Sequence, residues 1–261
     1  REVKQNSLNH FQDFVPQAMV EKTPEIEDLW KYYTGKPTNA DLIRDSQPGY
    51  SNSGVTLDAE KCINCKRCIR ICQTVQQIGA IHPITHVFSD QCLKCGHCIT
   101  VCPVHALRET YSYPDVQRAL ASGKICILQT APSVRVSVAE LFQKDYGTLC
   151  TGKIVAAARA IGFKYVFDVN FGADMTIMEE GVEFMQRLTG NGPLPLFTSC
   201  CPAWINYVET KHPEIIQYLS TTKSPHMMLG TIIKKYFAQL AGINEKDIYL
   251  VSVMPCTSKK D

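Results

Sequence analysis

Short apolar runs alternate with amphipathic stretches through the second half of the chain. Runs of strand length, rich in β-branched and aromatic residues, lie at 124–132, 165–170, 193–201 and 248–256. Apolar residues at helical spacing lie between them, at 133–143, 151–162, 174–188 and twice within 203–241. Strands that alternate with helices in this way predict an α/β layer, with a mostly parallel sheet flanked by helices.

The carboxyl ends of three predicted strands carry small and sulfur-containing residues. Residues 131–133 follow the first strand, Cys200 and Cys201 end the third, and Pro255 and Cys256 end the fourth. Parallel sheets place ligand sites at this end of their strands. Neighbouring residues of an extended segment point to opposite faces. We therefore expect a cofactor site whose wall contains two adjacent thiols with different tasks.

Before residue 111 the chain is dominated by a cysteine repeat. The run KCINCKRCIRIC recurs thirty residues later as QCLKCGHCITVC, with every cysteine offset preserved. The spacing C-x2-C-x2-C-x3-C is typical of bacterial-type ferredoxins, in which three thiolates of a tight loop bind one iron–sulfur cube and the fourth thiolate reaches the other cube. Two 4Fe–4S clusters are therefore predicted. Their ligands are Cys62, Cys65, Cys68 and Cys102 for the first cluster, and Cys92, Cys95, Cys98 and Cys72 for the second.

Zinc is the alternative interpretation of these cysteines, because C-x2-C pairs also form zinc ribbons. Four cysteines in each run, at iron–sulfur spacing, favour iron. The proline that usually follows the fourth cysteine is present as Pro103 but is replaced by Gln73 in the first run. The odd total of 13 cysteines argues against a secreted disulfide framework and favours reduced thiols in an intracellular compartment.

Charge and hydropathy narrow the range of partners. The 27 basic and 25 acidic residues give a net charge of +2, which offers no reason to expect nucleic acid or an anionic membrane. No apolar run approaches the roughly 18 residues that span a bilayer, so we expect a soluble protein without a membrane span.

Cys126 lies in an apolar run and is predicted to be a core residue, whereas Cys150 precedes a helix and has no assigned role.

The order of the motifs resembles the iron-only, or [FeFe], hydrogenases. The two cysteine runs are followed by TAPSVR at 130–135, FTSCCPAW at 197–204 and MPCTSKKD at 254–261, and the resemblance covers roughly residues 55–261. It implies a ferredoxin-like module with two 4Fe–4S clusters at 51–110, followed at 111–261 by the first α/β lobe of a catalytic domain. Residues 1–50 carry no motif to which a role can be attached.

The resemblance also implies an active centre, the H-cluster. This is a 4Fe–4S cubane joined to a di-iron subsite that carries CO, cyanide and a bridging dithiolate. Cys201 and Cys256 resemble two of the four cubane ligands, and Cys200 resembles the free thiol that relays protons to the metal. The residues that resemble those around the two-iron subsite are Pro132, Ser133 and Lys259, which would hold cyanide, and Met254, which would pack beside it.

Three residues of the predicted helix 174–188 could serve proton transfer. Glu180, Glu183 and Arg187 fall at i, i+3 and i+7 on one face. Taken alone, this spacing favours a solvated face with an i,i+4 Glu–Arg pair. The resemblance instead implies a proton channel from Cys200 through Glu180, Ser220 and Glu183 toward Arg187. His226 lies near where the family lines the subsite, although it could equally be an ordinary hydrogen-bonded histidine.

The predicted function is reversible reduction of protons to H2. Its predicted partners are ferredoxin or a similar electron carrier and the hydrogenase maturation factors, in the cytoplasm or in an anaerobic hydrogen-producing organelle such as the hydrogenosome. The family's third motif, with the remaining cubane ligands, does not occur before Asp261. We therefore expect a fragment of a longer hydrogenase that is inactive by itself. The alternatives are a non-catalytic iron–sulfur carrier or assembly protein, whose hydrogenase-like relatives lack the relay thiol and the lysine, and a sensory protein.

Overall fold

A computed structural model describes residues 51–82, 88–190 and 192–261 of the 261-residue chain. These residues form two compact units, each made from separate stretches of chain. The sheet unit comprises Tyr113–Gly172 and His226–Pro255. The cysteine unit comprises 51–112, Ala173–Pro225 and Cys256–Asp261. The predicted boundaries at residues 50 and 110 stay predictions, and residues 1–50 lie outside the described part of the chain.

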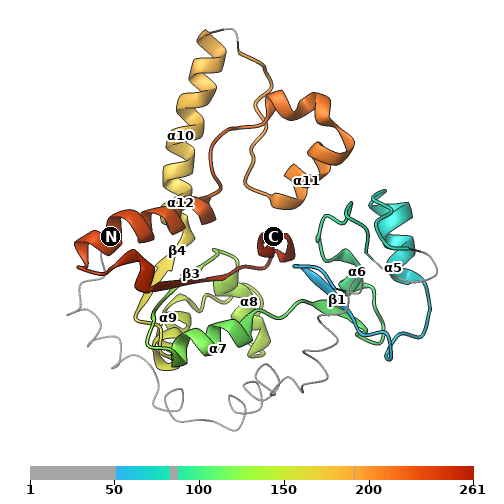
Figure 1. Cartoon of the computed structure of the whole chain (residues 1–261), viewed down its shortest axis with the longest axis horizontal. Helices are drawn as coiled ribbons and strands as arrows, with labels where there is room; N and C mark the ends of the chain where they lie inside the picture. Colours follow the sequence, from blue (N-terminus) through green and yellow to red (C-terminus); the bar gives the residue numbers. More distant parts are fainter. Residues whose placement is uncertain (1–50, 83–87, 191) are drawn as a thin grey trace. The chain divides into compact units, whose positions relative to one another are not determined.

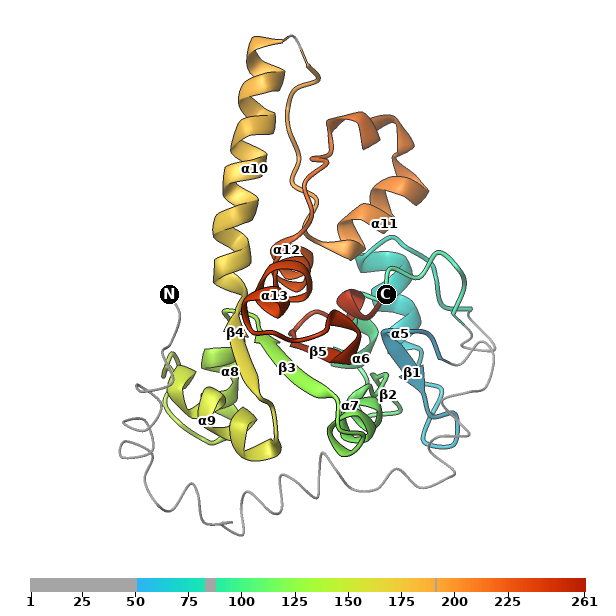
Figure 2. The same ribbon diagram turned by 60° about the vertical axis from the view of Figure 1, so that its left-hand side comes forward.

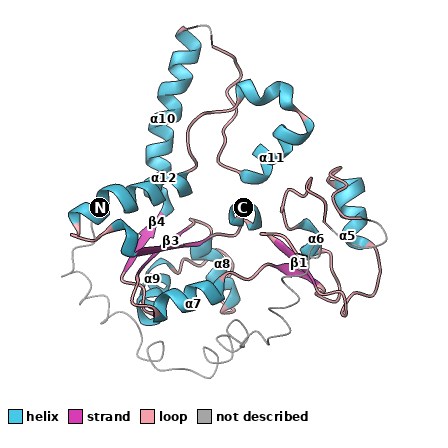
Figure 3. Ribbon diagram, in the orientation of Figure 1, coloured by secondary structure: helices cyan, strands magenta, loops and turns pink. Residues whose placement is uncertain are grey.

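The sheet unit is built on three parallel strands (Figures 1 and 3). They are β3 (Ile125–Thr130), β4 (Tyr165–Asp168) and β5 (Ile248–Val253), in the order β4-β3-β5. Both neighbours pair with β3 in parallel, and Thr130 is opposite Asp168 on one side and Val253 on the other. The prediction of an α/β layer on a parallel sheet is confirmed.

Helices cover both faces of this sheet (Figure 2). Cys126 and Leu128 of β3 pack against α7 (Tyr113–Ala121) and α9 (Thr151–Ile161). Ile127 points the other way and packs against α12 (Pro225–Ile232), the π-helical turn Ile233–Phe237 and α13 (Ala238–Leu240). This alternation is the side-chain period of a strand buried on both faces, and it confirms Cys126 as a core residue.

Helix α8 (Val134–Leu141) follows β3, and α10 (Val169–Thr189) follows β4 directly. The α10 helix begins at Val169 rather than at residue 174, because the Asp168 carboxylate at the end of β4 accepts a hydrogen bond from the Asn170 N–H, 3.0 Å away. It continues into the cysteine unit. None of the helices in the described ranges is long and apolar enough to cross a membrane.

The cysteine repeat folds as a repeat of backbone conformation. Strand β1 (Val55–Leu57) pairs antiparallel with β2 (Leu107–Glu109), and two short helices, α5 (Arg67–Arg70) and α6 (His97–Thr100), lie between them in the chain. A π-helical turn, Ile71–Val75, extends α5. Asn64 and Lys94 both have positive φ, and so do the helix N-caps Lys66 (φ 60°) and Gly96 (φ 78°). Positive φ is uncommon outside glycine, so its recurrence at matched positions marks two loops of the same shape.

The rest of the cysteine unit contains the second part of α10, α11 (Pro202–Lys211) and two 3-10 turns, Pro213–Tyr218 and Thr257–Lys260, joined by loops. A further 3-10 turn, Glu245–Asp247, precedes β5 in the sheet unit. The predicted strand at 193–201 is wrong, because only an isolated parallel bridge between Phe197 and Leu219 forms there. Pro193 and Pro195 lack N–H donors and cannot support a ladder.

Candidate metal centre

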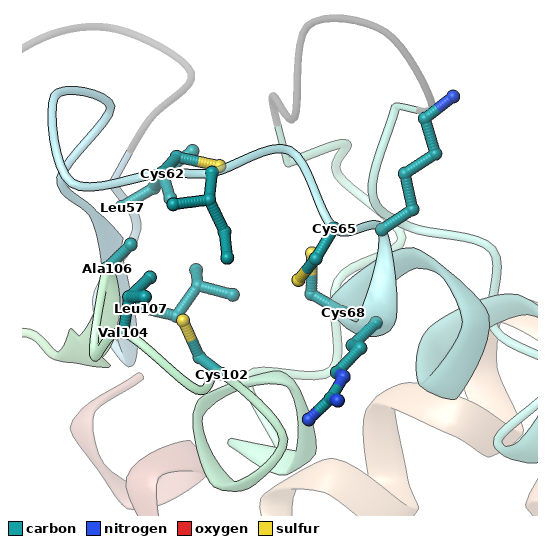
Figure 4. A pocket seen from close by; sticks show the side chains of 11 residues that line it. Leu57, Cys62, Cys65, Cys68, Cys102, Val104, Ala106 and Leu107 are labelled. Atoms are coloured by element: carbon teal, nitrogen blue, oxygen red, sulfur yellow. The ribbon is translucent and has the colours of Figure 1, made fainter.

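Four cysteines from both runs line one pocket of the cysteine unit (Figure 4). Cys62, Cys65 and Cys68 come from the first loop, and Cys102 comes from the end of the second run. The remaining lining includes the apolar side chains of Leu57, Val104, Ala106 and Leu107. This is the set of four sulfurs that the sequence assigns to the first cluster, including the ligand that crosses over from the other run.

The thiols of the second set of cysteines raise one another's pKa values. Burial raises the pKa of the Cys98 thiol, and the thiolates of its neighbours raise it further; these neighbours are Cys92, Cys95, Cys68 and Cys72. Burial likewise raises the pKa of the Cys92 thiol, with smaller contributions from Cys95 and Cys72. Cys72 of the first run also packs with Cys92 of the second against the same buried residues, Ile78, Ala80 and Leu93. Thiolates this close repel one another and are stable together only around positive charge, which a metal cluster supplies.

The spacing of four cysteines in each run favours iron–sulfur cubes over zinc. In a cube, each thiolate binds a separate corner, so four sulfurs can line one pocket without meeting at a single ion. The four cysteines of this pocket and their apolar surroundings fit the predicted first cluster.

Hydrogen-bond donors surround the sulfurs of the second set. The Asn52 Nδ2 donates to Cys92 Sγ at 3.4 Å, and the Ala80 N–H donates to Cys72 Sγ at 3.3 Å. His97 Nδ1 lies 3.2 Å from Cys95 Sγ. The amide of Asn52 is oriented by its own backbone, because Oδ1 accepts from the N–H groups of Gly54 and Val55 at 2.9 and 2.8 Å. Sequence reasoning missed Asn52, whose only local signal is a turn residue before a strand.

The end of the chain is bound to the second cysteine loop. Thr257 Oγ1 and Ser258 Oγ donate to the carbonyl oxygens of Lys94 and Leu93, both at 2.6 Å. Ser258 is fully buried, and Lys94 forms an ion pair with Asp261. A Cβ on Gly96 would lie 2.9 Å from Thr257 Oγ1, so glycine allows this close approach. The segment that carries Cys256 is thus hydrogen-bonded to the loop that carries Cys92 and Cys95, which the sequence did not predict.

The same segment is tied to the double cysteine. Lys259 Nζ donates to the Cys200 carbonyl oxygen at 2.9 Å, and Asn206 Nδ2 donates to Asp261 at 3.2 Å. Cys200 and Cys201 are both exposed, and Cys201 is the N-cap of α11. The two thiols therefore do not alternate across a strand. Cys201 directly precedes Pro202, the first residue of the helix, and Cys200 lies one residue before this N-cap.

The predicted proton-transfer residues divide into a connected group and an isolated one. Arg187 Nη2 lies 2.6 Å from Glu183 Oε1, and Ser220 Oγ donates to Glu183 Oε2 at 2.8 Å. Burial of Glu183 would raise the pKa of its carboxyl, but hydrogen bonds from Ser220, Arg187 and the Thr221 N–H, with the Arg187 charge, outweigh it and lower the pKa. The i,i+4 pair is largely buried, at 11% and 15% side-chain exposure, so the solvated-face interpretation is wrong. Glu180 makes no hydrogen bond or ion pair among the described residues.

The remaining predicted site residues lie in the sheet unit. Pro132 and Ser133 follow β3 and are exposed, and Ser133 is the N-cap of α8. Met254 follows β5. The Ala131 N–H donates to the Val253 carbonyl oxygen at 3.0 Å, which holds the ends of the two strands together. These residues thus share the carboxyl edge of the parallel sheet, as their positions in the sequence predict.

A buried polar group in the sheet unit was not predicted. Gln129 of β3 is 1% exposed, and its Nε2 donates to Ser252 Oγ of β5 at 2.8 Å. His226 Nε2 lies 2.6 Å from the same hydroxyl, so this histidine is hydrogen-bonded. Gln129 Oε1 is buried without a partner among the described residues. The sequence signal that could have revealed this buried group is a glutamine inside an otherwise apolar strand.

Comparison with known families agrees with the motifs. Residues 54–104 match the 4Fe–4S dicluster domain, and residues 124–261 match the C-terminal domain of the iron-only hydrogenase large subunit. These matches support iron–sulfur cofactors.

Individual relatives include iron hydrogenase 1 of Clostridium pasteurianum, 45% identical over 223 residues that span 80% of this chain and 39% of the relative. The periplasmic [Fe] hydrogenase large subunit of Nitratidesulfovibrio vulgaris is 44% identical over 213 residues, 79% of this chain and 50% of its own length. The cytosolic iron–sulfur assembly component 3 of Rattus norvegicus is 35% identical over 153 residues, 56% and 32% of the two lengths.

Solved structures give the same result. An apo [FeFe]-hydrogenase from Chlamydomonas reinhardtii aligns with a TM-score of 0.52 at 45% identity, over 56% of this chain and 39% of that one. The chain thus spans about two fifths to one half of the hydrogenases that it resembles. The match to the iron-only hydrogenase large subunit covers more than half of the 261 residues. The chain therefore belongs to the iron-only hydrogenase family.

Proposed function

We propose that the protein containing these residues catalyses the reversible reaction of two protons and two electrons to give H2. The observation that carries this proposal is the binding of the Cys256 segment to the second cysteine loop through Thr257 and Ser258. It joins a predicted electron relay to a predicted ligand of the catalytic cluster within one hydrogen-bonded structure. A two-cluster electron carrier that acts alone has no need of such a connection.

The eight cysteines of the two runs would bind two 4Fe–4S clusters, each with three ligands from one loop and one from the other run. Cys201 and Cys256 would be two of the four cubane ligands of the H-cluster. When bound, the H-cluster supplies the redox chemistry and the site at which hydrogen is formed or split. Pro132, Ser133, Lys259 and Met254 would hold its di-iron subsite.

Proton delivery would use the thiol of Cys200 as the last group before the metal. A thiol suits this step because the pKa of a thiol lies nearer neutrality than that of a hydroxyl and responds to its surroundings. Upstream, the Ser220 hydroxyl can pass a proton to or from Glu183, which it contacts at 2.8 Å. Arg187 orients the Glu183 carboxylate, and the hydrogen bonds from Ser220 and Arg187 lower the pKa of that carboxyl, which keeps it ionised between transfers. Glu180 would complete the path to Cys200.

The electron donor would be ferredoxin or a similar carrier, and maturation factors would insert the di-iron subsite. We place the protein in the cytoplasm or in an anaerobic hydrogen-producing organelle. The test is H2 production from reduced methyl viologen by the complete protein after maturation with the di-iron subsite. H2 production that is lost in Cys200→Ala but not in Cys150→Ala supports the proposal. No H2 from the matured protein contradicts it.

An iron–sulfur assembly role is the second candidate, because assembly components match part of the chain at 34–35% identity. Cys200 and Lys259, which resemble the relay thiol and the subsite lysine of the hydrogenases, favour the enzyme. An assembly protein should transfer a 4Fe–4S cluster to an apo-acceptor such as apo-aconitase. The hydrogenase proposal predicts retention of both clusters during this assay, and rapid activation of the acceptor would favour assembly.

A further inference from the structure

Positive charge gathers around one cysteine loop and not around the other. Residues 61–70 contain Lys61, Lys66, Arg67 and Arg70, whereas the matching residues 91–100 contain a single lysine, Lys94. The two loops have the same ligand spacing and the same backbone shape. Cluster binding alone therefore does not explain why only one of them is basic.

Three of the four cations have no acidic partner among the residues that the structure describes. Lys61 pairs with Asp58 at 3.2 Å, and Lys94 of the other loop pairs with Asp261. Lys66, Arg67 and Arg70 are exposed, and their side chains form no ion pair or hydrogen bond within the described part of the chain. We call these three residues the basic rim. Lys66 and Arg67 also line the pocket of the first cysteine set, so the rim borders the predicted cluster directly.

Apolar side chains lie beside the basic rim. Ile63 is 62% exposed and Val75 is 59% exposed, and Ile63 lines the same pocket. Cys65, between Ile63 and Lys66 in the chain, is exposed as well. Exposed apolar side chains next to unpaired charges are typical of surfaces that bind another protein. An exposed cluster ligand gives an electron a short route to such a partner.

The second loop has a different environment. Thr257 and Ser258 hold its backbone, and Asp261 neutralises its lysine. The second loop is therefore bound to the segment that carries the predicted catalytic ligand Cys256, whereas the polar side chains of the first loop face solvent.

We propose that the basic rim, with Ile63 and Val75, is the docking surface for a small acidic electron-carrier protein. The inference rests on the proposed function, because it supplies that reaction with electrons. The reduced carrier loses one electron, the first 4Fe–4S cluster gains it and passes from the 2+ to the 1+ state, and no proton moves. Complementary charge accelerates such encounters in a salt-dependent way.

The test uses the full chain with its 4Fe–4S clusters reconstituted, and an acidic flavodoxin in its hydroquinone form as the probe. Stopped-flow absorbance of the flavodoxin semiquinone gives the rate of electron transfer. The variant is Lys66→Glu/Arg70→Glu. Its matched control is Lys144→Glu/Lys153→Glu, which changes the net charge equally through two exposed lysines of the sheet unit.

We expect the rim variant to react at least tenfold more slowly than wild type at low salt, with the difference shrinking as salt rises. The control should stay within twofold, and reduction by dithionite should be unchanged in all proteins. Ile63→Ser, which leaves the charge intact, should slow electron transfer at every salt concentration. Iron content confirms that the clusters are present in each variant.

Equal flavodoxin rates in the rim variant and wild type would overturn the proposal. A slower reaction with dithionite and flavodoxin alike, with a shifted midpoint potential, would also overturn it, because the rim would then only neutralise the cluster's charge. Neither readout requires H2. Charge-dependent reduction without H2 production would leave the docking surface standing and remove the proposed function.

Discussion

The two cysteine loops share a ligand pattern and differ in almost everything around it. Cys62–Cys72 and Cys92–Cys102 have identical spacing, and their left-handed residues recur at matched positions. The first loop presents an exposed isoleucine and three exposed cations that form no ion pair with any described residue. The second receives hydrogen bonds from Asn52, Thr257 and Ser258. The ligand spacing determines which cofactor can bind, whereas contacts from distant parts of the chain give each site its role.

This difference indicates a direction for electrons. A loop that faces solvent suits entry of an electron, and a loop bound to the Cys256 segment suits its exit toward the catalytic cluster. Hydrogen bonds to cluster sulfurs stabilise the more negative, reduced state and raise the reduction potential. The donors around the second set would therefore make transfer from the first cluster to the second favourable.

Removing one crossover ligand should have the largest effect. Cys102→Ala should abolish the cluster of the first loop and spare the second, and Cys72→Ala should do the reverse, so that each variant loses about half of its cluster iron. Iron analysis and electron paramagnetic resonance of the reduced protein measure this. Loss of the second-loop cluster in Cys102→Ala would show that each run binds its own cube, and Cys126→Ala serves as the control that keeps both.

Loss of a hydrogen bond between the Cys256 segment and the second loop should have the next largest effect. Ser258→Ala leaves the buried Leu93 carbonyl without its donor, which costs about 1–3 kcal/mol of folding free energy. This corresponds to a fall of about 2–4 °C in the midpoint of thermal unfolding per kcal/mol. Ser89→Ala, at an exposed serine of the same unit, should leave the midpoint unchanged. Equal midpoints of the two variants would show that the Ser258 hydrogen bond contributes nothing to stability.

A matched pair of substitutions sharpens the comparison of the loop backbones. Gly96→Ala meets both the positive φ of 78° and the Thr257 hydroxyl at 2.9 Å, so we expect a loss of about 1–2 kcal/mol. Lys66→Ala, at the equivalent position of the first loop, replaces a residue that already adopts φ 60° and should cost little. Thermal unfolding of the two cluster-loaded variants distinguishes them, and equal midpoints would contradict the close approach at Gly96.

The smallest expected effect concerns the potential of the second cluster. Asn52→Asp keeps the acceptor for the Gly54 and Val55 N–H groups but removes the donor to Cys92 and adds negative charge. A hydrogen bond of about 1 kcal/mol corresponds to roughly 40 mV for one electron, so the potential should fall by at least that amount. Redox titration followed by electron paramagnetic resonance gives the reduction potentials of both clusters in one experiment. An equal shift in the first cluster would show a general charge effect rather than a local one.

Local patterns were enough to predict much of this molecule. The cysteine spacing predicted which sulfurs share a pocket, because the ligands of each loop are close in sequence and only one crosses over. The strands at 124–132, 165–170 and 248–256 were predicted by apolar runs long enough to be buried on both faces. The segment at 193–201 was mistaken for a strand because its apolar residues suggested one while its prolines excluded the ladder.

Long-range polar contacts could not be predicted. The donors from Thr257 and Ser258 reach carbonyl groups 163 and 165 positions earlier, and nothing in the pattern of either segment indicates the pairing. Asn52 and Gln129 illustrate the same limit, since each looks like an ordinary polar residue until its partner is known. Motif resemblance identified Glu183, Ser220 and Arg187 together, although helix spacing alone favoured a solvated pair.

The infrared spectrum of the complete, matured protein tests the hydrogenase assignment most directly. CO and cyanide on iron absorb in a region where protein does not, so the bands report the di-iron subsite itself. We predict these bands in wild type and in Cys200→Ala, in which the relay thiol is lost but the cluster remains, and their absence in Cys201→Ala, in which a cubane ligand is lost. Absence of the bands in matured wild type, or their equal loss in both variants, would contradict the account.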